Sequence, residues 1–124
     1  FVRRWPWLLK KMKMETTNTT QLETAIKNAL EIKTEMGREM IKVALDCLHL
    51  FDQKQQDYGS TNISASGEIG IAVRLQDKAS RMRHILLKEM RGETGVNNEA
   101  LFDTYQDVAN YGMIGMLLNK KLWK

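Results

Sequence analysis

The first half of the chain repeats apolar positions with the period of an α-helix. From Gln21 to Gln56 only Gly37 interrupts a run of residues that favour helix. One helix of that length would reach ~54 Å, more than a small domain needs, so we expect a break between Thr34 and Gly37. The sequence Thr20-Gln-Leu-Glu23 has the pattern of a capping box and predicts the start of the first helix.

Beyond this break, apolar residues lie on two sides of the predicted helix. One stripe consists of Met36, Met40, Val43, Ala44, Cys47 and Phe51, and the other of Ile41, Leu45 and Leu48. A helix with two apolar sides is either central in its domain or part of a subunit interface. We therefore expect a homo-oligomer.

Turn-forming residues then separate this region from two further helices. Gln55–Glu68 is rich in Gly, Ser and Asn and predicts a loop, after which a helix runs from about Glu68 to Met90. Arg91–Gly95 ends that helix, and Asn97 or Asn98 caps a last one over roughly Glu99–Asn119. The pattern predicts an all-α fold, a single helical-bundle domain of about four helices over residues 15–124.

Charge separates the first 14 residues from the rest of the chain. The net charge of +4 comes from residues 1–13, which hold five basic residues and no acid, because the remainder carries 14 basic and 15 acidic residues. This distribution argues against a duplex-binding surface on the domain. The basic and aromatic segment 1–14 has three readings: a non-native or upstream-translated extension, an arm that touches nucleic acid or a membrane, or a strap that packs its tryptophans. It is too short to span a membrane, and we expect no membrane partner.

The last predicted helix carries an acidic stripe. At ~100° per residue, Glu99, Asp103, Asp107 and Asn110 share one side, and Ile114, Leu117 and Leu118 continue it. A face that changes from acidic to apolar indicates the wall of a pocket. Carboxylate oxygens suit Mg²⁺, so these acids are candidate metal ligands. In the alternative, Asp103 and Asp107 form ion pairs with Arg74, Lys78 or Arg81 of the preceding helix.

That preceding helix supplies a row of cations. Arg74, Lys78 and Arg81 share a face, and Asp77 is placed for an i,i+4 ion pair with Arg81. The row either holds the phosphate of a ligand or is a solvated surface. Upstream, Asp57-Tyr58-Gly59 either caps a turn through Gly59 or stacks a base on Tyr58.

Other candidate chemistry is weak. Cys47, the single cysteine, lies in an apolar stripe and reads as a packed thiol in a cytosolic-type compartment. His49 and His84 have no partner at metal-ligand spacing, and no phosphate-binding glycine loop is found.

Three blocks in order carry a resemblance to a known family. They are Asp57-Tyr58-Gly59, then Gly67, Gly70, Arg74, Asp77, Lys78 and Arg81, then Glu99, Asp103, Asp107 and Tyr111. Together they resemble the phage and bacterial "nucleotide modification associated domain 1" family, with weaker similarity to MazG-type all-α nucleoside triphosphate pyrophosphohydrolases. Those hydrolases use E-x-x-E spacing, whereas the acids here are four residues apart.

The resemblance implies a phage-type protein in the bacterial cytoplasm. It would bind, modify or hydrolyse a nucleotide phosphate with Mg²⁺, with no residue assigned to catalysis. Glu99, Asp103 and Asp107 would hold the metal. The nucleotide would contact Arg74, Lys78, Arg81, Asp77, Asp57, Tyr58 and Asn110. The alternative function is a non-enzymatic helical module that sequesters a nucleotide or binds a host protein.

Overall fold

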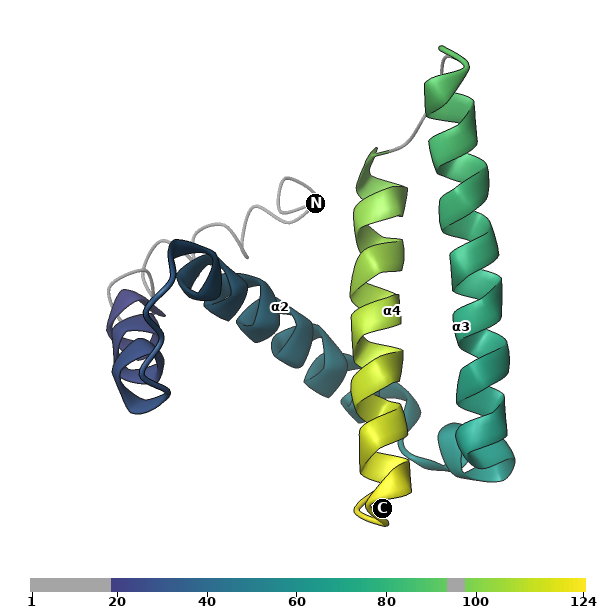
Figure 1. Ribbon diagram of the computed structural model, residues 1–124. Coiled ribbons are helices and arrows are strands. Elements are labelled where there is room, and N and C mark those ends of the chain that lie inside the picture. The colour runs from purple at the N-terminus through teal and green to yellow at the C-terminus, as the bar shows by residue number, and fades with distance from the viewer. Residues whose placement is uncertain (1–18, 94–97) are drawn as a thin grey trace. The chain divides into compact units, whose positions relative to one another are not determined.

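The computed structural model describes residues 19–93 and 98–124 (Figure 1). The N-terminal segment 1–14 and the predicted cap Asn97 lie outside these ranges. Within them the protein is all-α, as predicted, with four helices and no strand. None of these helices combines the length and the apolar character needed to cross a membrane.

The predicted break is confirmed, but it covers residues 30–34 and so meets only the Thr34 end of the expected region. A first helix covers residues 19–29, and α2 runs over Glu35–Tyr58. Thr34 is the N-cap of α2, because its Oγ1 accepts a hydrogen bond of 3.0 Å from the backbone N–H of Gly37. The expected cap at Thr20 is wrong. Residue 19 is already helical, and the carbonyl of Thr20 accepts a hydrogen bond from Thr24 Oγ1 inside the helix.

The chain divides into two compact units, one up to Asp46 and one from Cys47 onward. In the first unit, Ile41 is buried, while Met36 and Met40 of the predicted stripe are 68% and 64% exposed. The single domain and the oligomer stay predictions. The second unit holds the end of α2 and the two helices that follow, and it contains all the chemistry described below.

The predicted loop Gln55–Glu68 is mostly wrong. Only Gly59 and Ser60 separate α2 from α3, which runs over Thr61–Met90. Residues 61–66 are helical, and the break falls on Gly67, whose φ of 60° and ψ of −149° lie outside the helical region. The Ser- and Asn-rich stretch therefore forms a helical turn, and a single glycine redirects the chain.

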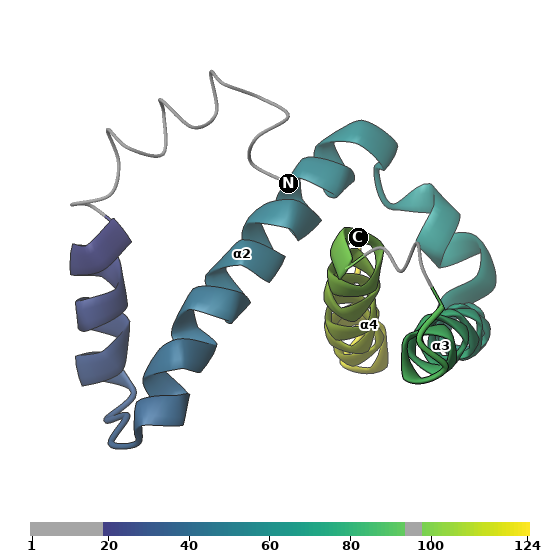
Figure 2. The same ribbon diagram turned by 90° about the horizontal axis from the view of Figure 1, so that it is seen from above.

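α4 runs over Asn98–Asn119, as predicted, and lies antiparallel beside α3 (Figures 1 and 2). Ile71 of α3 and Ile114 of α4 are buried between them. A Cβ added at Gly115 would meet Ile71 Cγ2 at 3.6 Å, an ordinary van der Waals contact, so Gly115 lies beside Ile71 where the two helices meet. Thr104 and Asn110 are also buried, whereas Met116 is 58% exposed. The polar side of α4 is therefore partly covered, as expected from the apolar residues that continue its acidic stripe.

Candidate functional site

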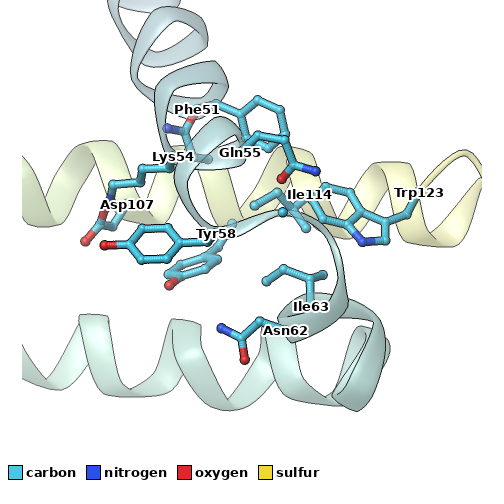
Figure 3. Close-up of a pocket in the computed structure, with 12 residues that line it drawn as sticks. Phe51, Lys54, Gln55, Tyr58, Asn62, Ile63, Asp107, Ile114 and Trp123 are labelled. Carbon is cyan, nitrogen blue, oxygen red and sulfur yellow. Dashed lines mark hydrogen bonds and ion pairs between the residues drawn. The ribbon is translucent and has the colours of Figure 1, made fainter.

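A cavity of about 260 Å³ opens where the end of α2, the start of α3 and one face of α4 meet (Figure 3). Its aromatic lining consists of Phe51, Tyr58, Tyr111 and Trp123. Its polar lining consists of Lys54, Gln55, Asn62, Asp107 and Asn110. Helical spacing explains this convergence, because Phe51, Lys54 and Tyr58 share one face of α2 and Asp107, Asn110 and Tyr111 share one face of α4.

Asp107 is held by two lysines from two different helices. Lys54 Nζ of α2 lies 2.9 Å from its Oδ1, and Lys78 Nζ of α3 lies 2.9 Å from its Oδ2. The Asp107 side chain is 19% exposed, against 24% for Lys78 and 49% for Lys54. Burial raises the pKa of Asp107, but the hydrogen bonds and charges of Lys78 and Lys54 outweigh it and hold that pKa below its ordinary value. The carboxylate is therefore charged at neutral pH.

Arg74 adds a third cation one helical turn before Lys78. Its guanidinium lies 6.0 Å from the centroid of the Tyr111 ring, one turn after Asp107 on α4. The antiparallel register thus pairs Arg74 with Tyr111 and Lys78 with Asp107. Arg74 Nη1 is buried and has no hydrogen-bond partner among the described residues. The positive charge of Arg74 is therefore neutralised by no carboxylate within that part of the chain.

Asn110 fixes α4 against α2. Its Nδ2 donates a hydrogen bond of 3.1 Å to the carbonyl oxygen of Cys47, and both residues are buried. Its Oδ1 is buried without a partner in the described ranges. Because the Nδ2 bond orients the amide, the position of Asn110 in the cavity wall is set by α2.

The α2–α3 corner shapes the rim of the cavity. Gly59 has a φ of 67° and its N–H donates to the carbonyl of Gln55, so the expected capping role of Gly59 is confirmed. This turn leaves Tyr58 74% exposed at the cavity (Figure 3), where stacking of a base stays a prediction. Asp57 is exposed and makes no ion pair with another described residue.

Several predicted site residues lie apart from this cluster. Asp77 and Arg81 are both exposed, and the ion pair expected between them is wrong: no nitrogen of Arg81 lies within 4.0 Å of a carboxylate oxygen of Asp77. Such a surface pair gains little in water, so nothing holds the two side chains together. Glu99 is exposed and Asp103 half-buried, and neither has an ion-pair partner among the described residues. Of the predicted acid–base pairs, Lys78 with Asp107 is confirmed.

The metal site stays a prediction. No group of three or more His, Cys, Asp or Glu residues within 19–93 and 98–124 is arranged to hold an ion. Mg²⁺ commonly takes only one or two carboxylates from protein, so a smaller set is chemically sufficient. Both carboxylate oxygens of Asp107 form ion pairs with lysines. Asp103, one helical turn away, has no such ion pair among the described residues and is the carboxylate that remains for a metal ion.

Sequence reasoning missed Lys54, Phe51 and Trp123. One local signal was present for Lys54, which stands four residues before Tyr58 and so shares its helical face. Trp123 carried no such signal. It enters the site through a hydrogen bond of 3.2 Å from its Nε1 to the carbonyl of Ser60, 63 residues away in sequence.

The cluster has an excess of positive charge, because two lysines, Lys54 and Lys78, contact the single carboxylate of Asp107, and Arg74 lies over Tyr111, one turn along α4. With four aromatic rings lining the adjoining cavity, the arrangement suits an anionic ligand that carries a flat ring. No family model, curated protein or solved structure matches this chain. The resemblance noted in the sequence therefore stays a prediction.

Proposed function

We propose that this protein binds a nucleotide through its phosphate groups at the cavity between α2, α3 and α4. The observation that carries the proposal is the convergence of Lys54 and Lys78 on Asp107, 2.9 Å from each, at the edge of an aromatic-lined cavity. Two ammonium groups from separate helices, with Arg74 nearby, form a positively charged position that an anion can share. Exposed Tyr58 offers a ring face for the base.

The size of the cavity limits what it encloses. Its volume of about 260 Å³ is close to the lower end of ~300–1,000 Å³ typical of small-molecule sites. We infer that the base and sugar occupy the aromatic part while the phosphates lie toward Lys54 and Lys78. A phosphate chain at the rim stays in contact with solvent, so its charge need not be fully buried.

Mg²⁺ enters this proposal as an ion carried by the phosphates. A free divalent cation is repelled by Lys54, Lys78 and Arg74, whereas a metal bound to phosphate oxygens arrives with compensating negative charge. Asp103, half-buried and one helical turn before Asp107, is the carboxylate best placed to meet it. Glu99, a further turn away and exposed, would act through water.

The test is a panel of nucleoside mono-, di- and triphosphates with and without Mg²⁺, read by calorimetric titration and thermal shift. Lys54→Met and Lys78→Met should each weaken binding about tenfold or more, since each removes a charge-assisted contact worth about 1.5–3 kcal/mol. Lys88→Met, on an exposed part of α3, is the matched control and should leave the affinity unchanged. Wild-type protein that binds no member of the panel would refute the proposal.

Phosphate release measured on the same samples separates the two forms of this function. Release that depends on Mg²⁺ indicates a phosphohydrolase. Binding without release indicates a protein that sequesters its nucleotide. Both forms use the same cavity, so the lysine variants test them equally.

A further inference from the structure

We propose that Asp107 is a built-in competitor of the ligand: it occupies the phosphate position between Lys54 and Lys78, and a phosphate binds by displacing it. The inference rests on the proposed function and assigns Asp107 a role opposite to that of a metal ligand. In this reading the carboxylate lowers the affinity for the ligand, because the ligand must exchange with an anion already present.

The geometry of the ion pairs supports this exchange. The two lysines do not share one oxygen of Asp107. Lys54 takes Oδ1 and Lys78 takes Oδ2, each at 2.9 Å. A carboxylate held by two cations through two oxygens presents the same kind of surface as two oxygens of a phosphate group, and basic side chains recognise both. The space between the two ammonium groups is therefore suited to a phosphate and is filled by the protein itself.

The two lysines differ in exposure, and this difference indicates which of them leaves Asp107 for the phosphate. Lys54 is 49% exposed, so its ammonium group can reach an incoming anion from solvent while it is still near Asp107. Lys78 is 24% exposed and packed between α3 and α4, so it is the better retained partner of the carboxylate. We infer that Lys54 changes partner from Asp107 to the phosphate, while Lys78 contacts both anions.

The charge of the carboxylate persists under physiological conditions. Burial raises the pKa of Asp107, and the hydrogen bonds from Lys78 and Lys54 more than reverse that effect. Asp107 is thus an anion at neutral pH. A charged competitor 2.9 Å from each lysine opposes every phosphate that approaches them.

The experiment measures the dissociation constants of inorganic pyrophosphate and of the four common ribonucleoside triphosphates, without Mg²⁺, by calorimetric titration. Asp107→Asn keeps the shape of the side chain and removes its charge, so at least one probe should bind about tenfold more tightly than to the wild type. Asp107→Ser, a second neutral variant, should shift the affinity in the same direction. Thermal unfolding of each variant checks that the fold is kept.

Asp52→Asn is the control, because Asp52 is exposed on α2 close to Lys54, bonds only to Gln56 among the described residues, and undergoes the same change of charge. Its affinity should change less than twofold. Equal tightening by Asp52→Asn, or weaker or unchanged binding by both folded Asp107 variants, would overturn the inference. The proposed function fails separately, when neither the wild type nor the Asp107 variants bind any probe.

Discussion

Trp123 Nε1 donates a hydrogen bond to the carbonyl oxygen of Ser60, 3.2 Å away. The same indole ring meets the Phe51 ring edge-on, with centroids 6.1 Å apart and planes inclined by 71°. The end of the chain is thereby attached to the corner between α2 and α3, beside the cavity. Gln55 strengthens that corner through a hydrogen bond of 2.5 Å from its Nε2 to Ser60 Oγ.

Trp123→Phe should remove the hydrogen bond to Ser60 while it keeps an aromatic ring against Phe51. We expect a loss of about 1 kcal/mol in the free energy of unfolding, the net value of one such bond. Trp123→Ala should cost several times more, because the ring contact is lost as well. Urea denaturation followed by circular dichroism measures both. Equal costs for the two variants would show that the ring contact with Phe51 contributes nothing, and an unchanged stability of Trp123→Phe would show the same of the hydrogen bond.

Gly67→Ala and Gly112→Ala should have opposite effects on stability, although an added Cβ meets no atom within 4 Å at either position. Gly67 has a φ of 60° and a ψ of −149°, a region almost exclusive to glycine, so alanine should cost about 1–3 kcal/mol. Gly112 is helical, and alanine there should stabilise by about 0.5–1 kcal/mol. Chemical denaturation of the pair tests the break in α3, and stabilisation by Gly67→Ala would contradict it.

Lys121→Gly should stabilise the protein and Gly92→Ala should destabilise it, each by about 1 kcal/mol. Both residues follow the end of a helix with a left-handed backbone, at φ of 59° and 68°. Each is followed by a residue whose N–H bonds back into the helix, Leu122 to Leu117 and Glu93 to Lys88. Thermal melts should show Tm shifts of opposite sign. Tm shifts of the same sign would mean that the left-handed backbone at residues 92 and 121 does not determine the stability of these two helix ends.

Asp107→Asn should reduce the loss of stability in acid. The pKa of Asp107 is lowered in the folded protein by Lys78 and Lys54 despite its burial, so the unfolded state binds a proton more readily. The stabilisation is complete above the ordinary Asp pKa of about 3.9 and is lost as the pH falls through the lower, folded value. Denaturation midpoints between neutral pH and about pH 2 should therefore fall less steeply for Asp107→Asn than for wild type. Parallel curves would refute the lowered pKa.

Local sequence predicted the helical elements well where a long apolar period was present, although the cap expected at Thr20 was wrong. The break before α2 was predicted from the length of the helical run and from Gly37, and the bounds of α4 followed from a capping residue and apolar periodicity, which act within a few residues of one another. The region 61–66 was misassigned because Ser and Asn favour loops and helix starts alike, and only the conformation of Gly67 shows which was realised.

The site was predicted in part. The ion pair between Lys78 and Asp107 was predicted as one of several acid–base pairs, because antiparallel helices that follow one another in the chain pack side by side. The exposure of Arg81 and Asp77 was not predicted. A helix can rotate about its axis by a fraction of a turn without any change in its sequence pattern, and this rotation decides which residues face solvent. Lys54 was absent from the predicted site, because its shared face with Tyr58 was the one local signal and the sequence does not show how the end of α2 packs against α3 and α4.

The sequence by itself determined that this protein is all-α, where α4 begins and ends, and that the side of α4 bearing Asp107 is partly covered. These properties depend on residues at most a few turns apart, whose spacing sets helix formation and the apolar side of each helix. Only the tertiary structure decided that Lys54 and Lys78 share the Asp107 carboxylate and that Trp123 closes onto Ser60. Such contacts join distant segments, and they depend on how the helices rotate and pack to bury their apolar surface.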